Sequence, residues 1–162
     1  MFNSVDFFRD CTERSKLAKK FGFGFAAVSG LDSFEDAIKS LTIYPALVCA
    51  TDSSEGYIEF SNTPHEHRVH TVFLAMRHPD GDMARRQECL LILRKLFRQF
   101  ISRIIRERDR LELDCQFITD RITFNEVDRY FFPGCACAYF NISEIIWESI
   151  FFNEDDWISS YL

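Results

Sequence analysis

Hydrophobic residues recur along this chain at two spacings, one typical of helices and one typical of strands. Apolar positions three or four residues apart predict helices over three ranges: residues 5–21, 33–41 and 83–108. Short apolar or alternating runs between turn signals predict strands over five ranges: residues 46–50, 56–60, 68–77, 111–117 and 136–142. This order of elements predicts an α+β fold, in which helices pack on one mainly antiparallel β-sheet with an aromatic C-terminal extension.

Turn and capping residues mark several of the expected element ends. Gly22 follows the last apolar residue of the first helix and is placed to end it. The polar connection between residues 56–60 and 68–77 indicates a β-hairpin. A strong turn signal at residues 78–82 closes with Asp82, which we expect to be the N-cap of the longest helix.

The length of 162 residues predicts one domain with a core that needs no disulfide or structural metal. We divide the chain into an α+β domain, residues 1–143, and a C-terminal arm, residues 144–162. No charge-free stretch of about 18 apolar residues occurs, which argues against a membrane span. The N-terminus lacks the basic and apolar regions of a signal peptide, so we expect a chain made and folded in a cytosol.

Phenylalanine accounts for most of the high aromatic content, with 18 Phe against 2 Trp and 5 Tyr. Five of them fall on expected inward faces and belong to an ordinary core: Phe73, Phe97, Phe100, Phe117 and Phe140. The adjacent pairs at 131–132 and 151–152 lie in a turn and in the tail, where a lone domain has little to bury them against. These pairs therefore favour contacts with other subunits.

The six cysteines include no C-x-x-C motif and no paired metal-binding blocks. Most are expected to be small buried hydrophobes, as Cys89 and Cys115 are by their place in apolar patterns. Cys135 and Cys137 are the one close pair, and we expect them on one face of a strand.

Charge is unevenly distributed, since residues 85–110 carry nine basic and three acidic residues, a local balance of +6. A basic helix can be a solvated face, a charged contact between subunits or a binding surface for nucleic acid phosphates. We expect four of its basic residues at subunit contacts: Lys95, Arg98, Arg103 and Arg106.

The C-terminal segment is rich in aromatic residues and has five acidic residues and no Lys or Arg after residue 140. One interpretation is a helix packed back on its own domain. The other is an arm that docks on a neighbouring protein, because aromatic anchors with an acidic rim are typical of interfaces. On the second interpretation four aromatic residues lie at contacts: Trp147, Phe151, Phe152 and Trp157.

All four histidines lie between residues 65 and 78. The best metal candidate combines His65, His67 and His70 with Asp80 and Asp82, although His70 points to the other face if the strand is unbroken. The alternative is a polar, partly exposed hairpin whose two aspartates cap a helix.

Catalytic sequence motifs are missing from the chain. It has no nucleophile elbow, phosphate-binding loop, dinucleotide-binding glycine motif or H-E-x-x-H. We therefore expect no enzyme, no catalytic residues, no bound metal and no cofactor.

Several segments together resemble a family of small virion proteins. These are residues 29–41, the strand entry Tyr44-Pro45, the strand that leads into the long helix, and residues 117–134 followed by Ala138-Tyr139-Phe140-Asn141-Ile142. Over residues 29–143 the chain resembles the tail-completion or tail-terminator proteins of tailed bacteriophages.

The resemblance implies a non-enzymatic subunit of a homo-oligomeric ring, expected to be a hexamer, at the head–tail junction. Its implied partners are copies of itself, tail tube or sheath proteins and head connector proteins, with DNA only as passing cargo and no membrane. Its implied location is the virion tail or neck, and the host cytoplasm during assembly. The competing hypothesis is a small metal-binding or metal-dependent hydrolytic protein that uses His65, His67 and Asp80. A third is a bacterial cytosolic adaptor of the same fold.

Overall fold

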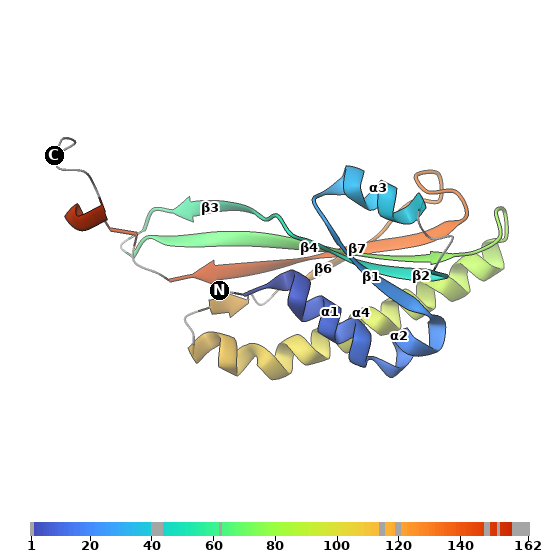
Figure 1. The fold of residues 1–162 in the computed structure, drawn as a ribbon, viewed down its shortest axis with the longest axis horizontal. Coiled ribbons are helices and arrows are strands. Elements are labelled where there is room, and N and C mark those ends of the chain that lie inside the picture. The colour runs from blue at the N-terminus through green and yellow to red at the C-terminus, as the bar shows by residue number, and fades with distance from the viewer. Residues whose placement is uncertain are drawn as a thin grey trace.

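A single mixed sheet of seven strands organises the computed structural model (Figure 1). The structure describes residues 2–39, 44–61, 63–113, 116–118, 121–147, 150–151 and 153–156. The strands are β1 (Phe23–Val28), β2 (Ala46–Thr51), β3 (Glu55–Glu59), β4 (His65–Arg77), β5 (Gln116–Ile118), β6 (Thr123–Glu126) and β7 (Cys135–Ile146). All strand pairs are antiparallel except β1 with β2, so the α+β prediction is confirmed.

The long strands β4 and β7 pair along their length and form the centre of the sheet. Each carries two shorter strands one after the other along its outer edge. β2 and then β3 pair with β4, while β6 and then β5 pair with β7. We call the β3 and β5 half of the sheet the distal end, and it lies on the left in Figure 1.

Helices cover both faces of the other half of the sheet. α1 (Ser4–Arg14), α2 (Lys16–Phe21) and α4 (Met83–Leu113) lie below the sheet in Figure 1, and α3 (Leu31–Lys39) lies above it. β2 is buried along its whole length between these layers, as its continuous apolar sequence predicts.

The larger core lies between the sheet and helices α1 and α4. At its centre the Phe140 ring packs against Phe8 and Phe97, with ring centroids 5.6 and 5.1 Å apart. The smaller core lies under α3, where the rings of Phe34 and Phe73 stack 4.2 Å apart. Phe132 packs edge-on against Phe34, so this member of the Phe131–Phe132 pair has a partner within its own domain.

Local sequence explains the ends of several helices. Asp82 caps α4 as expected, because its carboxylate accepts a hydrogen bond from the Arg85 amide at 2.9 Å. Gly22 ends α2 with a φ of +69°, in the left-handed region that favours glycine. The expected helix over residues 5–21 is broken at Ser15, which ends α1 and caps α2 through a hydrogen bond from the Ala18 amide.

Three predictions from the hydrophobic pattern are wrong in part. Residues 111–113 continue α4 and do not begin a strand, since a short apolar run at a helix end fits both periods. β1 was not predicted, because its glycine and alanines hide the strand pattern. The helical spacing of apolar residues over 83–108 places Ile105 beside the inward-facing stripe of the helix, but Ile105 is 65% exposed.

The last strand is longer than expected and continues to Ile146. The first three residues assigned to the C-terminal arm, residues 144–146, therefore belong to the sheet. After Ile146, the described residues contain one short 3-10 turn, Glu154–Asp156, which lies beyond the distal end of the sheet (Figure 1).

The described cysteines are free thiols. Four of them are buried: Cys11, Cys49, Cys89 and Cys137. Burial raises the pKa of the Cys49 thiol to about 12 and that of Cys11 to about 11. The prediction that Cys135 and Cys137 share one strand face is confirmed, while Cys115 lies outside the described residues.

No helix among the described residues is long and apolar enough to cross a membrane.

Candidate metal centre on the β3–β4 hairpin

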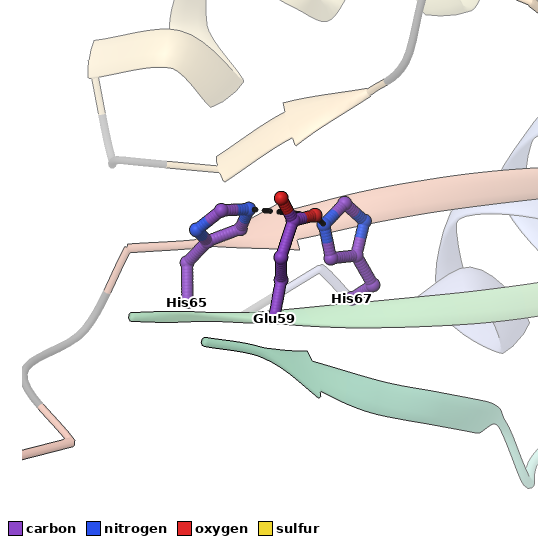
Figure 2. A group of neighbouring side chains, drawn as sticks. All are labelled: Glu59, His65 and His67. Atoms are coloured by element: carbon purple, nitrogen blue, oxygen red, sulfur yellow. Dashed lines mark hydrogen bonds and ion pairs between the residues drawn. The ribbon is translucent and has the colours of Figure 1, made fainter. Parts of the chain in front are cut away.

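Two histidines and a glutamate meet on one face of the β3–β4 hairpin. β4 begins at His65, three residues earlier than expected, so His65 and His67 both belong to the strand and point to the same side. Strand pairing places Glu59 of β3 directly opposite His65. Figure 2 shows the Glu59 carboxylate between the two imidazole rings.

The side-chain distances in this cluster are short. Nε2 of His67 lies 3.1 Å from Oε2 of Glu59, and Nε2 of His65 lies 3.6 Å from the same oxygen. One donor atom from each of the three residues lies within 4.8 Å of the other two. Imidazole nitrogen and carboxylate oxygen are common ligands of transition metals, so this group has the composition of a metal site.

Glycine at position 56 allows the two strands to approach this closely. A Cβ atom at Gly56 would collide with the backbone carbonyl oxygen of His67 on β4. In the same pairing of β3 with β4, Glu59 lies opposite His65.

Aromatic side chains hold both imidazole rings in place. The Tyr57 ring stacks on His67 with ring centroids 4.5 Å apart and 9° between their planes. The Trp147 ring lies against His65 with centroids 4.1 Å apart. As a result, the His65 side chain is only 9% exposed and that of His67 only 13%, while Glu59 is 51% exposed.

The other residues of the candidate metal cluster lie elsewhere. Asp80 and Asp82 follow the opposite end of β4, whose thirteen residues span about 40 Å, so Asp80 cannot join His65 and His67. Asp82 caps α4 instead. His70 points to the opposite face of the sheet, as the alternation of a continuous strand requires. The structure thus supplies Glu59 in place of Asp80.

His70 forms a separate buried pair with Glu144 of β7. Its Nε2 atom lies 3.0 Å from Oε2 of Glu144, and the Phe2 amide donates to Oε1 at 3.3 Å. Glu144 is fully buried at the distal margin of the larger core. The sequence interpretation missed this role, although the alternation of β7 places residue 144 on the same face as Phe140 and Ile142.

The basic residues expected at subunit contacts lie on α4. Lys95, Arg98 and Arg106 are exposed. Arg103 is used within the domain, where its guanidinium pairs with Asp10 of α1. The hydrogen bond from Arg103 holds the pKa of the Asp10 carboxyl below its usual value.

Two of the four aromatic residues expected at contacts fall on described parts of the tail. Trp147 is 40% exposed and Phe151 is 66% exposed. Phe152 and Trp157 lie outside the described residues.

Comparison with known proteins adds no assignment to this geometry, since no protein-family model and no curated protein match the chain.

Proposed function

We propose that this chain is a non-enzymatic structural subunit that assembles into a homo-oligomeric ring. The sequence resemblance indicates the kind of ring, a six-membered tail-terminator or tail-completion ring at the head–tail junction of a tailed phage. Its neighbours would be tail tube or sheath proteins and head connector proteins. The observation that carries the proposal is a group of exposed apolar side chains at the distal end of the sheet.

This group, which we call the distal surface, consists of Tyr57, Ile58, Phe60, Trp147, Ile150 and Phe151. Phe60 is 89% exposed, Phe151 66% and Tyr57 58%. They belong to β3 and to the segments that follow β3 and β7, and both strands pair with the His65 end of β4. Large apolar side chains left exposed at one end of a domain are typical of a protein interface.

The outer face of α4 offers a second surface of different chemistry. The exposed aliphatic residues Leu91 and Ile105 lie along it together with the exposed basic residues Lys95, Arg98 and Arg106. The tail carries exposed acidic residues, Asp155 and Asp156. In a ring each subunit uses two different surfaces, so the distal surface and tail of one copy can contact α4 of the next.

The energetics favour such a two-part contact. Full burial of one Phe contributes roughly 1.5–3 kcal/mol, whereas association costs about 4–15 kcal/mol in lost freedom. Phe60 and Phe151 alone therefore offset only the lower part of this cost. Contacts to the aliphatic and basic residues of α4 are needed for a stable ring.

The test is the mass and shape of the purified protein in solution. Size-exclusion chromatography with light scattering should give a closed oligomer, and negative-stain electron microscopy should show rings. The double variant Phe60→Ser and Phe151→Ser should lower the oligomer fraction at least about tenfold, with an unchanged circular dichroism spectrum.

A matched control is available at the other end of the sheet. Phe131 is 74% exposed and lies in the turn before β7, at the end of that strand opposite to the distal surface. Phe131 belongs to a pair that the sequence favours for subunit contacts, but the proposed contact uses the distal surface and α4, so Phe131→Ser should leave the oligomer intact. A wild-type monomer at all concentrations, or equal disruption by Phe131→Ser, would refute the proposal.

A further inference from the structure

We propose that Glu59, His65 and His67 bind one zinc ion per chain. This metal site goes beyond the proposed ring function. The ligand atoms are Nε2 of both histidines and a carboxylate oxygen of Glu59, and the fourth coordination position is open to water.

The spacing of the ligand atoms fits a tetrahedral ion. Zinc binds histidine nitrogen and carboxylate oxygen at about 2.0–2.2 Å, which places two ligands of a tetrahedral ion about 3.3 Å apart. The two nitrogen-to-oxygen distances here are 3.1 and 3.6 Å. All three donor atoms lie within 4.8 Å of one another, so movements of up to about 1.5 Å close them around one ion.

The hydrogen bond at Nδ1 of the His65 ring leaves Nε2, the proposed ligand atom, free to bind the ion. Nδ1 of His65 lies 3.0 Å from the backbone carbonyl oxygen of Thr63. A carbonyl can only accept, so Nδ1 carries a proton and donates it. In the neutral ring Nε2 then has a lone pair facing the Glu59 carboxylate. A cation bound between Nε2 and the carboxylate replaces their repulsion by two favourable bonds. A hydrogen bond from Nδ1 to a carbonyl oxygen is the usual way in which a metal-binding histidine is oriented.

The packing around the rings reduces the cost of ordering them. His65 lies between Glu59 on β3 and Trp147 after β7, and His67 is stacked on Tyr57. Both imidazoles are mostly buried before any ion arrives. Glu59 is the exposed member, so an ion can enter from its side.

The chemistry of the ligands selects among metals. Magnesium and calcium prefer sites built wholly of oxygen atoms, whereas two imidazoles and one carboxylate suit zinc and its neighbours. Three protein ligands leave one position for water. The ion would join β3 to β4, and so would stabilise the hairpin that carries the distal surface.

The experiment measures metal binding directly on the full chain. Protein treated with EDTA and dialysed is titrated with zinc by calorimetry, and we expect one saturable site per chain. Cobalt should give the visible absorption of a tetrahedral complex. Long-range proton–nitrogen NMR spectra should show zinc-dependent shifts of His65 and His67, with His70 and His78 unchanged.

Variants separate ligands from bystanders. Because His65 is buried, the ligand tests use the more accessible positions, and both Glu59→Gln and His67→Ala should weaken zinc binding by about 100-fold or more. His78→Gln is the matched control, since His78 follows the other end of β4, and it should retain wild-type affinity. Absence of a saturable site, or equal loss in His78→Gln, would overturn the proposal.

The result is independent of ring formation. Zinc affinity is a property of one hairpin, whereas the ring is measured by mass in the presence of EDTA. A ring that takes up no zinc in the titration would refute the zinc site alone, and a zinc-binding monomer would refute the ring alone.

Discussion

Glu144 provides a sharp test of the core, because it is a fully buried carboxylate in a segment that the sequence pattern assigned to an arm. We consider the variant Glu144→Ala. The carboxylate accepts hydrogen bonds from the His70 ring at 3.0 Å and from the Phe2 amide at 3.3 Å. Alanine removes both acceptors, and it leaves the two donors buried.

The size of the effect follows from these contacts. Each buried donor left without a partner costs about 1–3 kcal/mol, so the two donors together cost about 2–6 kcal/mol. We therefore expect Glu144→Ala to lower the free energy of unfolding by about 2–6 kcal/mol. This is a large fraction of the 5–15 kcal/mol typical of a domain.

The assay is urea unfolding followed by circular dichroism, with a double-mutant cycle through His70→Ala. The double variant should be less destabilised than the sum of the two single variants, because each single change already breaks the pair. If residue 144 lay in a solvent-exposed arm, Glu144→Ala would change stability by less than about 0.5 kcal/mol. Such a result, or strictly additive effects, would refute the buried pair.

Two further variants test other contacts. Arg103→Met removes the hydrogen bond that lowers the Asp10 pKa, and the pair is partly exposed, so we expect a loss of only about 0.5–1 kcal/mol near pH 7. Because folding lowers the Asp10 pKa, the pair stabilises the protein at pH values above the unfolded pKa of 3.8, and this stabilisation is lost as the pH falls through the folded pKa. Near pH 3 the free energies of unfolding of wild type and Arg103→Met should therefore differ less than at pH 7. An equal difference at both pH values would contradict the pairing. Gly56→Ala introduces a Cβ that collides with the His67 carbonyl, so amide exchange in β3 should accelerate at least about tenfold while β7 is unchanged. The control Glu55→Ala, at an exposed position of the same strand, should leave exchange near wild type.

Much of the fold was predictable because it depends on local periodicity. The buried strand at residues 46–50, the hairpin and the helix that begins after Asp82 each have a pattern of their own. β1 did not, because the Gly24 and alanine positions have little apolar contrast. The helix end at residues 111–113 was misassigned, since a few apolar residues satisfy both the helix and the strand period.

The candidate site was half predictable. Alternation along a strand placed His65 and His67 on one face and His70 on the other, and the structure confirms both. The prediction of the third residue of the cluster was wrong. Sequence proximity suggested Asp80, whereas strand pairing brings Glu59 opposite His65. The register between two strands depends on where the hairpin turns. It therefore cannot be derived from the hydrophobic pattern of either strand alone.

By itself, the amino-acid sequence determined the α+β class, the inward phenylalanines such as Phe140 and the shared face of the two histidines, because each follows from spacing within one segment. Only the tertiary structure decided that Glu59 joins the histidines, that Glu144 pairs with His70, and that Arg103 binds Asp10. Each of these contacts joins different elements of the fold. Two of the three contacts join residues that are more than 70 positions apart in the sequence. Their formation depends on strand register and on the packing of helices against the sheet, which arise only when the whole chain has folded.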